Sequence, residues 1–231
     1  MKTFVTSIVS LFTVCGYAQD VVEASAGVDV VSRYIWRGMS LGDASIQPTA
    51  GLSYKGVSLS AWGSYDILNK KSDKEFDLTL SYSIGGFNIG ITDYYTSSYG
   101  EENTYFEYRA DRTSHVWEAN IGYDFGPVAI QWFTNFAGSD GANKDGKRAY
   151  SSYAEISAPF KVADCDWLAN VGTVPYATDA YGVDGFAVVH ISLRCTKDVT
   201  LCKKSFPVFV EGICNPNTKK GYLVVGASVE L

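Results

Sequence analysis

The stretch from Asp77 to Ile84 reads D-L-T-L-S-Y-S-I, so polar and apolar side chains alternate at every step. Successive side chains of a β-strand point to opposite faces, and this stretch therefore predicts a strand with one apolar face and one polar face. The same alternation continues from about Ala26 to Leu231. We therefore expect an all-β protein, whose architecture depends on the number of strands and on the connections between them.

Twelve segments of the chain carry this strand pattern. They lie near residues 25–37, 45–55, 57–66, 75–85, 87–97, 115–125, 128–137, 149–160, 165–175, 186–195, 205–214 and 221–231. Bacterial outer-membrane barrels have an even number of antiparallel strands. The pattern therefore predicts a closed antiparallel transmembrane β-barrel of about 12 strands, and a soluble β-sandwich is the alternative.

The connections between these segments alternate in length, which supports the barrel independently. Tight turns are expected at Lys55-Gly56, Gly85-Gly86, Gly126-Pro127 and residues 161–164, with longer polar loops near 38–44, 67–74, 98–114, 138–148 and 176–185. Short periplasmic turns and long outer loops are typical of such barrels, so the N-terminus is expected on the periplasmic side. Two connections fit less well, because 196–204 is long for a periplasmic turn and 215–221 is short for an outer loop.

The first residues have the three parts of a secretory signal peptide. Met1-Lys2 give a positive start, residues 4–14 an apolar run, and Gly16-Tyr17-Ala18 a small-residue cleavage site. The apolar run is too short to span a bilayer. We therefore expect a signal peptide over residues 1–18 and a transmembrane β-barrel domain over residues 19–231, located in the cell outer membrane of a Gram-negative bacterium.

The composition agrees with a barrel and argues against one class of partner. Tyr, Phe and Trp number 16, 12 and 5, and no later segment approaches the apolar length of a membrane helix, ~20 residues. A barrel hides its hydrophobicity in alternation, which explains a mean hydropathy of only -0.02. The net charge of -6 and the pI near 4.9 argue against binding to nucleic acid, which requires a basic surface.

Charged residues within the strands indicate which face points inward. An Arg on the lipid side at mid-bilayer costs roughly 2–4 kcal/mol, so such residues should face the interior. The predicted pore-lining residues are Asp29, Arg33, Arg37, Trp62, Glu75, Asp77, Glu118, Glu155, His190, Arg194 and Glu211. Tyr34 and Trp36 have the opposite parity to Arg33 and Arg37 and are then expected to face lipid. Asp93 does not fit, because it shares the parity of apolar neighbours, and a β-bulge in its strand is one explanation.

Segments spread over almost the whole mature chain resemble a known family. Residues 32–41 read S-R-Y-I-W-R-G-M-S-L, and residues 47–52 read Q-P-T-A-G-L. These segments resemble the opening of the TorF family of outer-membrane porins, and Tyr34 to Gly38 is the most specific part. Further similar segments are 57–66, 146–156, 206–218 and 222–226. The resemblance implies an outer-membrane barrel with a poorly defined transport role and carries over no catalytic residues. The C-terminal Leu231, in place of the common aromatic residue, and four cysteines after the signal depart from the pattern.

Residues that could support catalysis are sparse. His115 and His190 are the only histidines, and His115 lies beside Ser114 and near Asp111 at the expected outer rim. Neighbours in sequence do not make a Ser-His-Asp triad, which forms in three dimensions. We therefore expect no enzyme.

The loop near residues 138–148 carries a weak calcium signal. Asp140, Asn143 and Asp145 have suitable oxygen atoms, but Ala142 and Lys144 occupy positions that should also supply ligands. We therefore expect an ordinary turn-rich loop there, with no metal and no cofactor.

The polar inner face and the family resemblance together predict a narrow diffusion channel for small solutes. The alternative is a closed barrel with a structural role, or with a partner-binding role through its outer loops. A barrel of eight strands is filled by its own side chains, and a barrel of sixteen strands leaves an aqueous channel. A barrel of twelve strands has an intermediate width. Aromatic residues expected to narrow the interior are Trp62, Tyr94, Phe133, Phe186 and Phe209. Acidic residues outnumber Arg on the predicted inner face, which favours the passage of cations modestly.

The expected partners are outer-membrane lipid, small solutes and the outer-membrane assembly machinery, while the oligomeric state is left open.

The cysteines leave several pairings open. If segments 165–175 and 186–195 form a hairpin about Ala180, Cys165 and Cys195 face each other at a separation that a disulfide allows. An exported location would let such a bond persist. Cys202 is an alternative partner for Cys195, Cys214 is expected to stay unpaired, and free thiols are the third possibility. Cys15 also permits a lipoprotein interpretation, although its preceding residues fit a lipidation sequence poorly.

Overall fold

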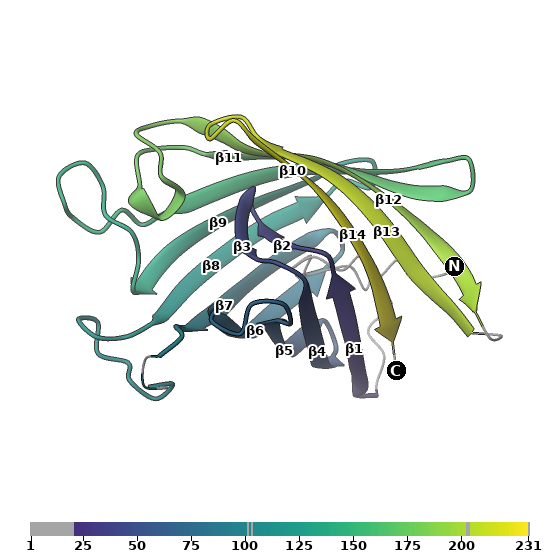
Figure 1. Cartoon of the computed structure of the whole chain (residues 1–231), viewed down its shortest axis with the longest axis horizontal. Helices are drawn as coiled ribbons and strands as arrows, with labels where there is room; N and C mark the ends of the chain where they lie inside the picture. The colour runs from purple at the N-terminus through teal and green to yellow at the C-terminus, as the bar shows by residue number, and fades with distance from the viewer. Residues whose placement is uncertain (1–20, 101, 103, 202–203, 231) are drawn as a thin grey trace.

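Twelve antiparallel strands close into one barrel in the computed structural model, which describes residues 21–100, 102, 104–201 and 204–230 (Figure 1). The barrel strands are β1 (Glu23–Val31), β4 (Ser45–Tyr54), β5 (Val57–Asp66), β6 (Lys74–Ile84), β7 (Phe87–Ser97), β8 (His115–Asp124), β9 (Ala129–Gly138), β10 (Ser152–Val162), β11 (Cys165–Val174), β12 (Ala187–Leu201), β13 (Lys204–Asn215) and β14 (Lys220–Glu230). Each pairs with its neighbours in sequence order, and β1 pairs with β14, with Val28 opposite Val229. The predicted fold class and strand number are therefore confirmed.

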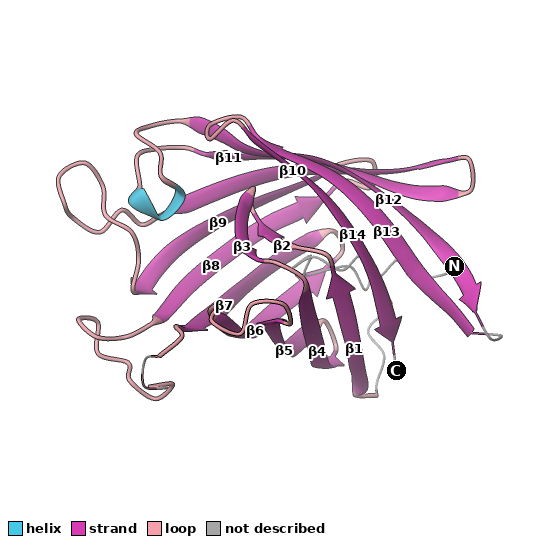
Figure 2. Cartoon of the chain, in the orientation of Figure 1, coloured by secondary structure: helices cyan, strands magenta, loops and turns pink. Residues whose placement is uncertain are grey.

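Tight turns lie at one end of the barrel, as the sequence predicted. Lys55-Gly56, Gly85-Gly86 and Ala163-Asp164 each join two strands, and all six residues have positive φ. Two consecutive left-handed residues make the turn whose twist matches a β-hairpin. The long connections between β7 and β8, between β9 and β10 and between β11 and β12 lie at the other end (Figure 2). The last of them contains a short 3-10 helix, η1 (Asp179–Tyr181).

The barrel is polar inside and apolar outside. On β6, Leu80 is 54% exposed and Ile84 61% exposed, whereas the alternate residues Asp77 and Ser81 are buried. The predicted alternation therefore translates into two faces of the wall. Apolar side chains that cover the outside of other strands include Leu52, Leu59, Ile121, Ile156 and Leu223.

The first strand differs from the prediction. β1 ends at Val31, and residues 32–44 form a separate hairpin of β2 (Tyr34–Trp36) and β3 (Met39–Gly42). Its turn consists of Arg37 and Gly38, with φ of 47° and 79°. These left-handed residues turn the chain back. The alternation of side chains after Val31 therefore does not indicate which residues face the inside or the outside of the barrel wall. Figure 1 shows this hairpin within the ring of strands.

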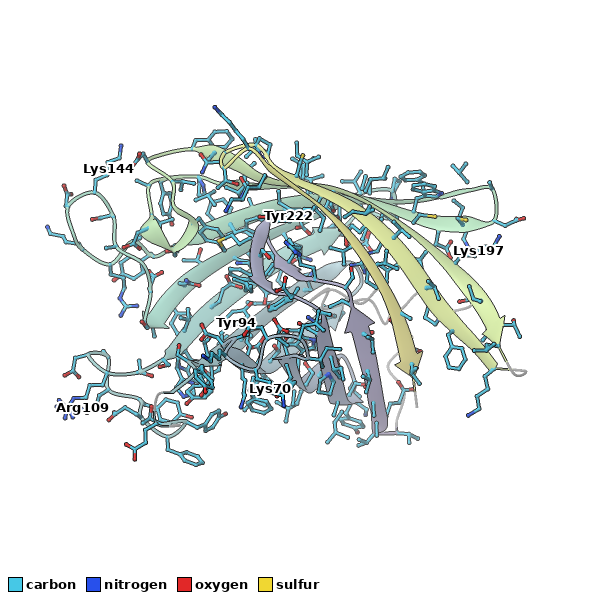
Figure 3. All side chains as sticks on the ribbon, viewed as in Figure 1. Lys70, Tyr94, Arg109, Lys144, Lys197 and Tyr222 are labelled. Carbon is cyan, nitrogen blue, oxygen red and sulfur yellow. The ribbon has the colours of Figure 1, made fainter. Side chains whose placement is uncertain are left out.

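Strands β12 and β13 are longer than predicted. The segment near 196–204 was expected as a turn, but Thr196 to Leu201 continue β12. Pairing of β12 with β11 ends at Thr196, and pairing of β13 with β14 ends at Val208. Residues between these points therefore pair only across β12 and β13, as a two-stranded ribbon that extends beyond the neighbouring strands. Figure 3 shows Lys197 on this ribbon, far from Arg109 and Lys144 at the opposite end.

The register between β11 and β12 corrects the predicted cysteine pair. Trp167, not Cys165, lies opposite Cys195. The reason is that the connection is a long loop with η1 and that the register shifts between Gly172 and Thr173, so no symmetric hairpin forms about Ala180. Cys165 and Cys195 become diagonal neighbours, and both are free thiols, as is Cys214. Cys202, Cys15 and the predicted signal peptide lie outside the described residues.

Candidate functional site

The β2–β3 hairpin crosses the interior of the barrel. It connects β1 to β4, which are adjacent in the ring, and its tip reaches β8, β9 and β10 on the opposite side. The contact between Arg37 and Glu118 of β8 joins residues 81 positions apart in the chain. The hairpin therefore spans the lumen, and its tip is the centre of the candidate site.

The guanidinium of Arg37 forms a buried ion pair with Glu118. Its Nη1 donates to Oε2 at 2.6 Å and its Nη2 donates to Oε1 at 2.8 Å, which is the two-pronged geometry of strong Arg–carboxylate pairs. The two side chains are 7% and 3% exposed. Nη1 also donates to Tyr181 Oη at 2.6 Å, and Tyr94 Oη donates to Glu118 Oε1 at 2.9 Å. Both carboxylate oxygens of the pair thus have a partner.

Aromatic rings enclose the same guanidinium. Its central carbon lies 4.5 Å from the ring centre of Trp36, 4.3 Å from that of Phe133 and 4.5 Å from that of Tyr153. A cation within about 6 Å of a ring face is attracted by the ring quadrupole. We call the group of Glu118, Phe133, Tyr153, Tyr181 and Trp36 the guanidinium cage.

Local sequence features place the rings of the cage. Tyr153 lies over Gly172 of the neighbouring strand, where any Cβ would overlap the Tyr153 hydroxyl. Thr178 caps η1 by accepting from the Ala180 N–H, and η1 then presents Tyr181 to the interior. Burial raises the pKa of the Tyr181 hydroxyl, against the opposing effect of the Arg37 charge, so this phenol stays neutral at physiological pH.

The sides of the hairpin fill the lumen with apolar contacts. Trp36 and Met39 pack on the buried cluster of Phe133, Tyr153, Val174, Tyr181, Val183 and Val189. Ile35 packs on a second cluster of Val31, Phe209, Ile213 and Val224. Tyr34 packs near Trp62 with ring centres 5.5 Å apart. Tyr34 and Trp36, expected to face lipid, are therefore inside, and that expectation was wrong because the chain leaves the wall at Ser32.

The predicted pore-lining residues fall into two groups, those on the hairpin segment and those on the inner face of barrel strands. Arg33 lies at the base of the hairpin and not on a barrel strand, and it is half-exposed and paired with Asp43 at 3.2 Å. Arg37 does reach the interior, but on the hairpin and not on a barrel strand. Those on the inner face of barrel strands are Asp29, Trp62, Glu75, Asp77, Glu118, Glu155, His190, Arg194 and Glu211. Phe186, which was also expected inside, precedes β12 and is 71% exposed.

A second buried ion pair lies on the inner face at β12 and β13. Arg194 and Glu211 oppose each other directly in the register. Arg194 donates to Glu211 Oε2 from Nη2 at 2.7 Å and from Nε at 3.0 Å, and its guanidinium lies 3.9 Å from the ring centre of Phe209. The lumen thus repeats one arrangement, in which an Arg joins a carboxylate and an aromatic face.

A small cavity lies at the base of the hairpin. It has a volume of about 100 Å³ and is lined by Tyr34, Leu41, Gly42, Ser45, Ser64, Asp66, Asp73, Lys74, Glu75 and Thr96. Asp66 closes its rim by accepting from the N–H groups of Asp43, Leu68 and Asn69. A cavity of this size holds a few water molecules and not a through-going channel.

Asp93 and His115 form a separate cluster on the outer wall. Asp93 Oδ1 lies 2.7 Å from His115 Nδ1, and the Tyr105 carbonyl oxygen lies 2.6 Å from His115 Nε2. Both ring nitrogens thus lie within hydrogen-bond distance of an oxygen atom. The ring of Tyr108 stacks on His115 at 4.5 Å, so the loop 98–114 covers the pair.

This cluster explains the misfit at Asp93 without a bulge in its strand. Leu78 and Trp117 lie opposite Asp93 in an unbroken register on either side. The partner of His115 is therefore Asp93, whereas Asp111 contacts Arg109. The ring nitrogen that would activate a nucleophile points at a carbonyl instead, so the neighbours Ser114 and Asp111 form no triad with it.

The loop near residues 138–148 uses its oxygen atoms internally. Asp140 Oδ1 accepts from the Gly141 N–H and from Asn135 Nδ2, and Asn143 Oδ1 accepts from two N–H groups in its own turn. Asp179 Oδ1 accepts from the Ala142 N–H at 2.6 Å, which ties this loop to η1. Within the described ranges, no group of three or more His, Cys, Asp or Glu residues could hold a metal ion.

The chain matches no protein-family model and no curated protein sequence. In the part of the chain that the structure describes, no helix has the length and apolar character needed to cross a membrane. The barrel and the hairpin are therefore the basis for a functional proposal.

Proposed function

We propose that this protein is an outer-membrane porin whose lumen is closed by the β2–β3 hairpin and conducts small solutes when the hairpin withdraws. The observation that carries the proposal is the ion pair of Arg37 with Glu118 across the lumen. The hairpin can leave as a unit, because only its base continues into the barrel strands β1 and β4. The similarity to the TorF family of porins, noted from residues 32–41, supports the same proposal.

The apolar outer surface of the barrel supports the proposed location in a membrane. An apolar band on a barrel wall requires an apolar solvent, because monomeric soluble proteins expose such patches only over a few hundred Å². Exposed Leu, Ile and Val side chains occur on the outside of strands all around this ring. Lipid is the surrounding that fits a closed barrel with a polar interior. An N-terminus on the periplasmic side and insertion by the outer-membrane assembly machinery follow from that location.

Ion selectivity follows from the charges of the lumen. Glu75, Asp77, Glu155 and Glu118 face the interior, and withdrawal of Arg37 leaves them with fewer cations nearby. Carboxylates that line a pore raise the local concentration of cations. We therefore propose a modest preference for cations in the open state.

Planar-bilayer recording tests the proposal. The test variant replaces residues 33–42 with a short Gly-Ser linker, and the matched control replaces residues 68–72 in the loop between β5 and β6. We expect the wild type and the control to be mostly closed and the test variant to conduct in discrete steps. A folded test variant that gives no conductance steps would reject the channel.

A second candidate function rests on the loop 98–114. This loop covers the outer wall and presents Phe106, 86% exposed, together with Tyr99 and Tyr108. Arg109 and Arg112 add exposed charges that pair only with the neighbouring Asp111 among the described contacts. A closed barrel that binds a partner through this loop is the alternative, and the absence of conductance in both variants would favour it.

A further inference from the structure

We infer that the barrel contains a binding site for small guanidinium compounds, which Arg37 occupies from within the chain and which such solutes occupy when the hairpin withdraws. The binding itself does not depend on conduction, whereas its role in transport rests on the proposed function. The site is the guanidinium cage, most of whose walls belong to the barrel.

The cage recognises the guanidinium group and not the rest of Arg37. The carboxylate of Glu118 accepts from two different nitrogens, and the hydroxyl of Tyr181 accepts from one of them. Phe133 and Tyr153 lie over the planar group, with ring centres 4.3 Å and 4.5 Å from its central carbon. A planar cation with a fork of N–H donors satisfies all of these contacts at once, whereas a compact ammonium cannot donate in the same two-pronged geometry.

Most of the cage belongs to the barrel and remains when the hairpin leaves. Glu118 lies on β8, Phe133 on β9, Tyr153 on β10 and Tyr181 on η1. Only Trp36 comes from the hairpin itself. Withdrawal of the hairpin therefore removes the occupant and one ring, and leaves the carboxylate, the hydroxyl and two aromatic faces in place.

One feature makes exchange for a solute favourable. Loss of Arg37 leaves the Glu118 carboxylate, 3% exposed in the closed barrel, without its counter-charge. A solute that brings its own guanidinium restores that charge, so hairpin withdrawal and solute binding support each other.

Three small compounds separate the chemical properties that the site should recognise in a ligand. Methylguanidinium offers the charge, the plane and the fork of donors. Methylammonium keeps the charge but has neither the plane nor the fork, and urea keeps the plane but has no charge. A small ligand with so few atoms reaches a dissociation constant on the order of 1 mM.

The test uses Arg37→Gly in the full chain in detergent micelles. Glycine adopts the left-handed turn freely, so this change removes the guanidinium without adding backbone strain. Lys55→Gly is the matched control, because Lys55 has φ of 49° at the same position of a two-residue turn. We expect the unfolding midpoint of Arg37→Gly to rise on addition of methylguanidinium. The rise should set in at a methylguanidinium concentration on the order of 1 mM, the expected dissociation constant. Methylammonium, urea and the Lys55→Gly variant should give no such rise.

A second variant covers the case in which Arg37→Gly does not fold. The chain with residues 33–42 replaced by a Gly-Ser linker keeps four of the five cage residues, and calorimetry should show it binding methylguanidinium. Adding Glu118→Gln to either variant should abolish the response. Equal responses to methylguanidinium and methylammonium, or none in a folded variant, would overturn the site. If the variants bind methylguanidinium but give no conductance, the binding site stands and the channel is rejected. If they conduct but do not bind methylguanidinium, the channel stands and the binding site is rejected.

Discussion

Gly38 and Val189 are in such close contact that any Cβ on Gly38 would overlap the carbonyl oxygen of Val189. The side chain of Asn215 also donates to the Gly38 carbonyl oxygen at 3.3 Å. The tip of the hairpin is thus seated against the backbone of β12 and the end of β13, close to the cage that holds Arg37. Only glycine fits at this point, both for space and for its φ of 79°.

Substituting Gly38 should therefore dislodge the hairpin. We expect Gly38→Ala to lower the free energy of unfolding in micelles by about 1–3 kcal/mol more than Gly146→Ala does, because overpacking adds to the left-handed penalty. Gly146 has a φ of 70°, but no neighbouring atom lies within 4 Å of the position that a Cβ would take, so it carries the backbone penalty alone. Gly38→Ala should also raise the open probability in bilayers. Equal effects of the two substitutions would mean that the tip is not seated on β12.

The ion pair of Arg194 with Glu211 should contribute far more than a pair on the surface. Glu211→Gln leaves Arg194 buried without its counter-charge, which costs about 3–5 kcal/mol. Lys161 and Asp166 also pair at 2.7 Å, but Lys161 is 67% exposed, so Asp166→Asn should cost less than about 1 kcal/mol. Urea unfolding in micelles measures both. A small effect of Glu211→Gln would show that water reaches Arg194 freely.

His115 should hold the loop 98–114 against the outer wall. We expect His115→Phe to keep the stacking but to lose the contacts of both ring nitrogens, and to speed tryptic cleavage after Arg109 and Arg112. Hydrogen bonds to charged groups are worth about 1.5–3 kcal/mol, so the rate should rise roughly 10- to 100-fold when cleavage follows local opening. Cleavage after Lys144 is the internal control, because the loop 138–148 bonds to the backbone carbonyl of His115 through the Ser139 N–H, a contact that does not depend on the His115 side chain. An unchanged ratio of the two rates would contradict this role.

The wall of the barrel could be predicted because its signals are local. The alternation over β6 and the Gly85-Gly86 turn each specify a strand or a turn from neighbouring residues alone. The hairpin was missed because Tyr34, Ile35 and Trp36 continue the same apolar-rich pattern although they pack into the lumen. The one sequence signal that could have revealed it is Arg37-Gly38, a pair suited to a two-residue turn between apolar segments.

The candidate site was predicted only in part. Parity placed Glu118 and Phe133 inside correctly, since both lie on strands of the barrel wall. Parity could not assign Tyr153 and Tyr181 to one cage, because their meeting depends on Gly172 and on the cap of η1, which are distant in sequence. Likewise, the exception at Asp93 depended on a loop that folds back over the outer wall, which alternation within a strand does not report.

The pair of Arg37 and Glu118 joins the tip of the hairpin to the far wall of the lumen. Single-channel recording of Arg37→Met, Glu118→Gln and the double variant measures whether this pair keeps the barrel closed, because a double-mutant cycle isolates the coupling between the two residues. We predict that each single substitution raises the open probability well above that of the wild type, and that the double variant opens no more than the more open single variant. Open probabilities that multiply independently, or that equal that of the wild type in all three variants, would contradict the account.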